Sequence, residues 1–160
     1  PAGEYQYYNK RHLFSLAKEG EHYQAGTEQV VFLWKGWRIF PQICYDLRFP
    51  VWARNTMDYD VYLNVANWPA QRAFAWQNLL RARAIENQCF VIGVNRIGFD
   101  GNGHNYQGDS VVLDPLGQPI AELTDKATSP TITLSYDLLS QTRARFPFLN
   151  DRDAFTWAHD

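Results

Sequence analysis

The sequence predicts an α/β fold in which strands and helices alternate through the middle of the chain. Two short apolar runs, residues 60–65 and 89–95, are typical of buried strands, and residues 74–87 between them carry the clearest helical pattern. An apolar strand over residues 37–43 precedes them. The order strand, helix, strand, helix, strand favours a layered sheet with right-handed crossovers.

The first elements have local signatures. Aromatic residues favour a strand over residues 5–10. Residues 29–34 and 37–43 flank Lys35-Gly36, a two-residue hairpin signal. A short helix over residues 47–57 would hold Pro50 near its first turn, where proline is tolerated. The sequence therefore predicts a hairpin that leads into the first helical segment.

The later elements follow from periodicity and turn residues. The helix at 74–87 has one apolar face, with Arg81, Arg83 and Glu86 mostly on the other. A glycine- and asparagine-rich loop is expected at 98–108. The remaining expected elements are strands at 109–113, 120–123 and 131–134 and a short helix at 137–145.

Composition limits the classes of function. The chain has 160 residues, 46% of them hydrophobic, enough for one globular domain over residues 1–160. The formal net charge is −2 without basic or acidic blocks, so we expect neither a nucleic-acid nor a membrane partner. No apolar run reaches the length of a membrane span, and we expect no signal peptide. Two cysteines form no disulfide framework, which favours a cytoplasmic location.

Cys44 is the strongest candidate nucleophile. The strand at 37–43 runs directly into it, and a polar, proline-containing segment leaves it, so its side chain should project into a cleft at a strand-to-helix bend. A helix N-terminus at this position would stabilise a thiolate. The alternative is a buried structural cysteine, against which the polar neighbours Tyr45, Asp46 and Arg48 argue. Cys89, in an apolar run, is expected to be inert core.

A thiol nucleophile needs a proton acceptor and a donor for the developing oxyanion. Lys10 and Glu21 lie in expected loops or at strand ends and carry suitable groups, although solvated loop residues are the more frequent alternative. Asn67 and Trp68 follow a buried strand, where open α/β sheets place ligand contacts. Their alternative is ordinary turn chemistry. The four dispersed histidines make no metal-ligand spacing with the cysteines, so we expect no metal site.

Several motifs follow one another along nearly the whole chain. They are Tyr8-Asn9-Lys10-Arg11-His12-Leu13-Phe14, Glu21 a few residues before Gly26, Ile43-Cys44-Tyr45-Asp46-Leu47-Arg48-Phe49-Pro50, Asn64-Val65-Ala66-Asn67-Trp68-Pro69, Arg81-Ala82-Arg83-Ala84-Ile85-Glu86-Asn87-Gln88 and Asn95-Arg96-Ile97-Gly98. Taken together and in this order, they resemble the carbon–nitrogen hydrolase (nitrilase) superfamily, and within it most closely the YafV-type omega-amidases.

The resemblance implies part of a four-layer α-β-β-α sandwich and a homodimer or higher homo-oligomer. It also implies a cysteine acyl-enzyme with a Glu-Lys-Cys triad and no cofactor. Lys10 matches the family lysine, Cys44 the nucleophile, and Glu21 a second glutamate that supports the lysine. The backbone N–H of Tyr45 would complete the oxyanion hole with the Lys10 amine.

The expected reaction is hydrolysis of the terminal amide of an α-keto dicarboxylate monoamide such as 2-oxoglutaramate, with release of ammonia. Arg72 is the candidate anchor for the substrate carboxylate on position alone, and a solvated arginine is its alternative. Two other functions remain open. One is a carbon–nitrogen hydrolase for a keto-methylthio amide or an N-carbamoyl compound, and the other is a catalytically incomplete fragment that acts as a binding module.

One departure from the family pattern concerns the general base. The family's first glutamate precedes the lysine motif, whereas this chain begins just before that motif, and residues 1–4 resemble a hairpin turn. We therefore expect the C-terminal portion of a carbon–nitrogen hydrolase domain, with the preceding portion of the same protein as a partner. Glu4, in the expected turn, does not match the missing base.

Overall fold

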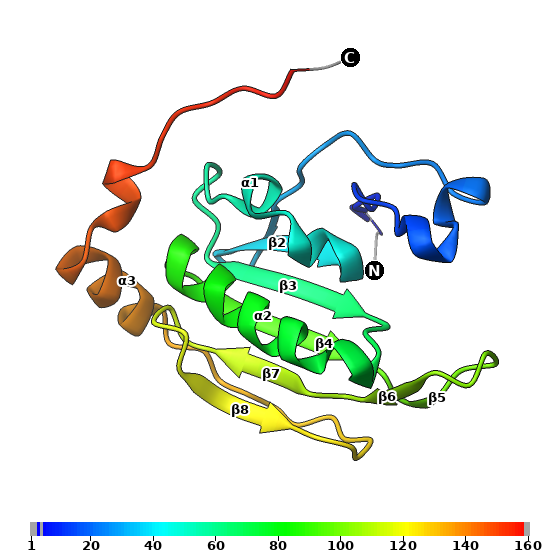
Figure 1. The fold of residues 1–160 in the computed structure, drawn as a ribbon. Coiled ribbons are helices and arrows are strands. Elements are labelled where there is room, and N and C mark those ends of the chain that lie inside the picture. Colours follow the sequence, from blue (N-terminus) through cyan, green and yellow to red (C-terminus); the bar gives the residue numbers. More distant parts are fainter. Residues whose placement is uncertain (1–2, 4, 159–160) are drawn as a thin grey trace.

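The chain folds around one six-stranded mixed sheet in the computed structural model, which describes residues 3 and 5–158 (Figure 1). The strand order is β1-β2-β3-β4-β7-β8, and β5 pairs with β6 in a separate hairpin. Strands β2, β3 and β4 are parallel, and the outer pairs are antiparallel. The strands are β1 (Phe32–Trp34), β2 (Trp37–Ile43), β3 (Val61–Ala66), β4 (Phe90–Asn95), β5 (Ile97–Phe99), β6 (Asn105–Gln107), β7 (Ser110–Leu113) and β8 (Pro119–Leu123).

Three α-helices and five short 3-10 helices accompany the sheet in the described part of the chain. The long helix α2 lies across one sheet face (Figure 1). The α-helices are α1 (Pro50–Ala53), α2 (Ala73–Asn87) and α3 (Tyr136–Arg145), and the 3-10 helices are η1 (Ser15–Ala17), η2 (Glu19–Glu21), η3 (Cys44–Arg48), η4 (Ala70–Arg72) and η5 (Phe148–Asp151).

The main core lies between the sheet and α2. Trp76 and Leu80 of α2 are fully buried against the sheet, and a Cβ on Gly93 of β4 would lie 2.5 Å from Leu80 Cδ1. Glycine therefore lets the helix and the sheet approach closely. A smaller cluster of Val61, Phe90 and Leu139 connects the opposite face to α3.

The predicted α/β fold is confirmed. Of the four expected layers, the described residues form one sheet with α2 over one face, and Leu139 of α3 packs against Val61 and Phe90 on the other. No helix among them is long and apolar enough to cross a membrane. The expected turn at residues 1–4, including Glu4, lies outside the described residues except for Gly3.

Several expected elements differ in the structure. Residues 5–10 and 131–134 form no strand, and the expected helix at 47–57 is reduced to η3 and the single turn of α1. The expected loop at 98–108 contains most of the β5–β6 hairpin. Arg83, expected mostly on the polar face of α2, is buried because its guanidinium donates to the carbonyl of Leu47 and to Glu86. The position of Arg83 therefore depends on a contact between separate elements, α2 and η3.

Candidate active site

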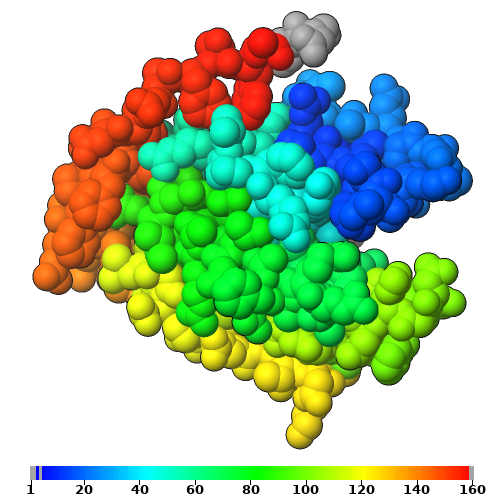
Figure 2. Space-filling model, viewed as in Figure 1, coloured from blue at the N-terminus to red at the C-terminus, as the bar shows by residue number. Residues whose placement is uncertain are grey.

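A cavity of about 840 Å³ lies where β2 and β3 end. Parallel strands expose their carboxyl ends at one edge, which is the usual ligand site of such sheets. The segment with η1 and η2 forms one wall and the β5–β6 hairpin forms another, and Figure 2 shows the hollow between the blue segment and the yellow-green hairpin. The lining includes Lys10, Phe14, Glu19, Cys44, Asn67, Arg72, Asp100, Asn102, His104 and Tyr106.

Cys44 occupies the predicted bend between strand and helix. It follows β2 directly, begins η3 and has a φ of 47°, a left-handed conformation that is uncommon for a residue other than glycine. Its Sγ lies 3.8 Å from the carbonyl oxygen of Asn67, to which the thiol donates. This backbone conformation aims the thiol into the cavity, and such strained conformations cluster at functional sites.

Burial raises the pKa of the Cys44 thiol above its ordinary value, and the positive charge of Lys10 opposes this effect. The thiolate predicted from the helix N-terminus stays a prediction, because η3 is only a five-residue 3-10 helix and burial acts against the charged form of the thiol. Cys89 is fully buried, and burial raises its pKa as well. The prediction that Cys89 is a core residue is confirmed.

Lys10 lines the same cavity as Cys44 and forms an ion pair with Glu19. Lys10 Nζ donates to Glu19 Oε2 over 2.5 Å, and the two side chains are only 13% and 26% exposed. The same carboxylate oxygen accepts the backbone N–H of Phe14 over 2.9 Å. The carboxylate therefore fixes both the lysine head and the turn that follows it.

Glu21 does not make the contact with Lys10 that the sequence predicts. Its side chain is 59% exposed and lies 3.4 Å from Lys18 Nζ. Residues two positions apart in a short helix point in different directions, so Glu19 and Glu21 cannot share a partner. The sequence analysis named Glu21 and passed over Glu19, and no local pattern in the sequence separates the two residues.

The predicted substrate contacts divide into two groups. Asn67 and Arg72 line the cavity, whereas Trp68 is buried beneath it and donates from Nε1 to the carbonyl of Arg72 over 2.8 Å. The prediction of Trp68 as a substrate contact is thus wrong in geometry: it supports the backbone of Arg72. The Tyr45 ring packs against Phe14, and its backbone N–H, at the second position of η3, has no partner within that helix.

Sequence reasoning missed the contribution of the β5–β6 hairpin. Asp100 Oδ1 accepts the backbone N–H groups of Asn102 and His104 over 2.9 Å, and its Oδ2 accepts the Tyr106 hydroxyl over 2.8 Å. These bonds lower the pKa of Asp100, and the His104 N–H makes the largest contribution. The tip therefore has a fixed shape where it lines the cavity. The Asp100-Gly101-Asn102-Gly103 stretch is the part of the sequence that could have indicated this turn.

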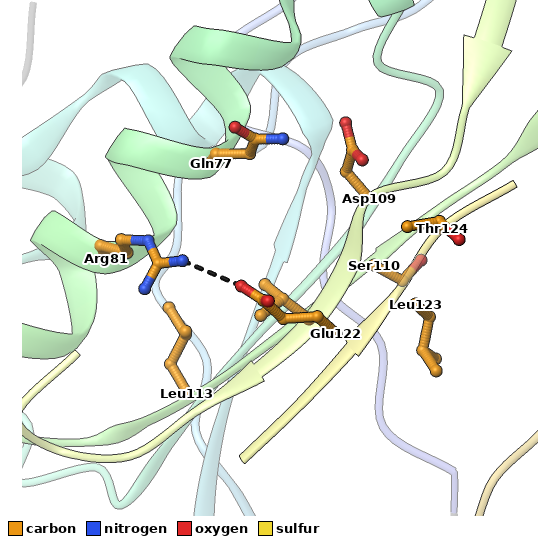
Figure 3. Close-up of a pocket in the computed structure, with 9 residues that line it drawn as sticks. Gln77, Arg81, Asp109, Ser110, Leu113, Glu122, Leu123 and Thr124 are labelled. Carbon is orange, nitrogen blue, oxygen red and sulfur yellow. Dashed lines mark hydrogen bonds and ion pairs between the residues drawn. The ribbon is translucent and has the colours of Figure 1, made fainter. Parts of the chain in front are cut away.

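A second, smaller hollow of about 210 Å³ lies between α2 and strands β7 and β8 (Figure 3). Arg81 crosses it and pairs with Glu122 over 2.9 Å, and it also donates to the carbonyl of Gly117. The charged side chains there satisfy each other, and none of the predicted site residues lines this hollow. Within the described residues, no group of three or more His, Cys, Asp or Glu is arranged to hold a metal ion.

Known proteins resemble this chain in sequence and in fold. The carbon-nitrogen hydrolase family matches residues 1–145. The chain is 56% identical to the omega-amidase YafV of Yersinia enterocolitica over 97% of its own length and 61% of the relative. It is 42% identical to the 2-oxoglutaramate amidase of Bacillus subtilis over 72% of its length and 45% of the relative.

A solved structure extends the comparison to the fold. XC1258 from Xanthomonas campestris, described as a CN-hydrolase superfamily protein with an arsenic adduct in the active site, superposes with a TM-score of 0.94 at 53% identity. It covers 96% of this chain, which spans 61% of XC1258. These matches do not support a missing catalytic glutamate or a C-terminal portion, and both stay predictions. The family match and the shared fold show that the chain belongs to the carbon-nitrogen hydrolase family.

Proposed function

We propose that the protein is an omega-amidase that hydrolyses the terminal amide of an α-keto dicarboxylate monoamide such as 2-oxoglutaramate. The observation that carries the proposal is one cavity lined by a cysteine, a lysine–glutamate pair and an arginine: Cys44, Lys10, Glu19 and Arg72. The names of two relatives, an omega-amidase and a 2-oxoglutaramate amidase, support the substrate class.

Cys44 is the nucleophile of this reaction. Its sulfur attacks the amide carbon, the C–N bond breaks, and the leaving nitrogen takes a proton and departs as ammonia. Water then attacks the thioester, the C–S bond breaks, and a carboxylate and the free thiol result. Because burial raises the pKa of Cys44, the thiol must lose its proton to a base during attack. A glutamate that precedes Lys10, implied by the family resemblance, stays the predicted base.

Lys10 stabilises the tetrahedral intermediate. Its ammonium is the cation in the cavity whose charge acts most strongly on Cys44, and it donates a charge-assisted hydrogen bond to the oxyanion. The Tyr45 backbone N–H supplies the second donor. Glu19 takes the supporting part that the sequence assigned to Glu21, because it is the carboxylate bound to Lys10.

Arg72 binds the carboxylate at the far end of the substrate. Its guanidinium lies over the ring of Phe14, 5.3 Å from the ring centroid, and Trp68 holds its carbonyl, so the side chain is restrained from both ends. A restrained guanidinium in a partly buried cavity recognises a carboxylate through charge-assisted hydrogen bonds. Asn67, whose carbonyl meets Cys44, borders the reacting amide. The homodimer and the cytoplasmic location stay predictions.

Ammonia release from 2-oxoglutaramate, a keto-methylthio amide, an N-carbamoyl amino acid and a neutral amide tests the proposal. We expect the keto dicarboxylate monoamide to have the highest kcat/KM, the Cys44→Ala variant to be inactive, and the Cys89→Ala control to keep its activity. Intact-mass measurement should reveal an acyl adduct on Cys44. A preference for another acyl group would favour the second hydrolase function, and turnover by Cys44→Ala would refute the mechanism. Substrate binding without turnover would favour the binding module.

A further inference from the structure

Asp46 is a fully buried carboxylate two residues after the nucleophile in η3. It accepts four hydrogen bonds. Oδ1 receives the backbone N–H and the Nδ1 of His12, each over 2.9 Å, and Oδ2 receives the Tyr8 hydroxyl over 2.9 Å and the backbone N–H of Ile43 over 3.1 Å. A buried carboxylate is tolerated only with such partners.

The donors come from two separate parts of the site. Ile43 immediately precedes the nucleophile, whereas Tyr8 and His12 stand two residues before and two residues after Lys10. One carboxylate thus bridges Cys44 and Lys10 from both flanks of the lysine. Capping of η3 alone requires only the contact with Ile43, so the other three bonds need another explanation.

The lysine segment depends on this bridge because residues 5–12 form no helix or strand. Its other fixed points are the ion pair of Lys10 with Glu19, the backbone and side-chain bonds of Lys10 and Arg11 to Gly26, the Arg11 guanidinium over the Trp52 ring, and the His12 ring stacked on Phe49 at 3.6 Å. The Tyr8 hydroxyl also accepts the Nε1–H of Trp52 over 3.1 Å. Asp46 is the partner that joins Tyr8 and His12 to each other and to the nucleophile turn.

We propose that Asp46 is a positioning residue that sets the distance and orientation of Lys10 relative to Cys44. The inference rests on the roles assigned to these two residues under the proposed function. Preorganised donors stabilise an oxyanion only when they are held in place, and misplacement by about 1 Å costs on the order of 100-fold in rate. Asp46 does not line the cavity, so we expect its effect on the reaction to pass through Lys10 and Cys44.

Asp46→Asn is the direct test. The amide keeps the shape but replaces one acceptor oxygen with an NH₂ group, so one of the two donor pairs loses its partner. We expect kcat to fall by about 10- to 100-fold, with KM changed less than twofold. The matched control is Asp60→Asn, another buried carboxylate that bonds Arg143 and the Arg38 N–H, because it lowers stability without contact to the site.

A second readout separates positioning from a merely structural role. Iodoacetamide alkylation of Cys44 against pH reports the charges that act on the thiol, namely Lys10, Glu19 and Arg72. If Asp46→Asn displaces Lys10, the profile moves to higher pH, as in Lys10→Met, while Asp60→Asn leaves it in place. Because this readout needs no turnover, it stays informative even if the proposed substrate is wrong.

Tyr8→Phe keeps the inference testable if Asp46→Asn does not fold. It removes one bond to the lysine segment and leaves Asp46 intact, so we expect a smaller shift in the same direction. Asp46→Asn, or Tyr8→Phe in its place, with wild-type kcat and an unshifted alkylation profile would overturn the inference. An equal loss of kcat in Asp60→Asn would do the same.

Discussion

Replacing Glu19 by glutamine examines which of two neighbouring carboxylates supports the active-site lysine. Lys10 Nζ lies 2.5 Å from Glu19 Oε2, and both side chains are mostly buried. A hydrogen bond between charged groups contributes about 1.5–3 kcal/mol. Since glutamine keeps an acceptor oxygen and Glu19 is partly exposed, the loss should fall near the lower end. A loss of about 1.5 kcal/mol corresponds to roughly a tenfold decrease in kcat/KM.

Initial rates with the preferred amide, at several substrate concentrations, give kcat and KM for Glu19→Gln and for the matched control Glu21→Gln. Both variants remove one negative charge from η2, so a nonspecific effect of net charge would be equal in the two. Glu21 is exposed and, among the residues that the structure describes, pairs with Lys18, and such a pair contributes little. We therefore expect wild-type rates for Glu21→Gln. The reasoning would be refuted if Glu21→Gln lost activity and Glu19→Gln did not.

Three further predictions follow from the same geometry. Lys10→Met should lower kcat by about 100- to 1000-fold and leave KM nearly unchanged, because the bond from Lys10 to the oxyanion exists only after attack. A raised KM with normal kcat would mean that Lys10 only binds substrate. Arg72→Ala should raise KM for the keto dicarboxylate monoamide by roughly 10- to 100-fold, through loss of a charge-assisted contact, and should leave KM for a neutral amide unchanged. Equal effects on both substrates would argue against Arg72 as the carboxylate anchor. Iodoacetamide should modify Cys44 before Cys89. The rate at Cys44 should keep rising with pH beyond the ordinary thiol pKa, because burial raises the pKa of Cys44. Peptide mapping that found Cys89 modified first would reverse the roles assigned to the two cysteines.

The sequence alone determined those elements whose signal is local. The apolar runs of β3 and β4 and the helical pattern of α2 predicted their positions to within one residue at either end. The bend at Cys44 was predictable because a strand ending in a polar segment is visible along the chain. Lys10, Cys44, Asn67 and Arg72 were named from position and motif, and all four line one cavity.

The tertiary structure decided which side chains face one another. Glu19 and Glu21 are the same residue type two positions apart, so the sequence does not distinguish them. The fold brings Glu19 to Lys10 and leaves Glu21 beside Lys18. Trp68 and Arg72 are neighbours in the chain, yet one packs beneath the cavity and the other lines it.

The same holds for Arg83 and Asp46. Periodicity favours a solvent position for Arg83, whereas the Leu47 carbonyl gives its guanidinium a buried partner. Asp46 accepts hydrogen bonds from Tyr8 and His12, which lie more than thirty residues away in the sequence. Local sequence indicates whether a residue favours the buried or the exposed face of a helix or strand, or a turn. Hydrogen bonds between distant segments satisfy buried charges, and these exist only after the chain has folded.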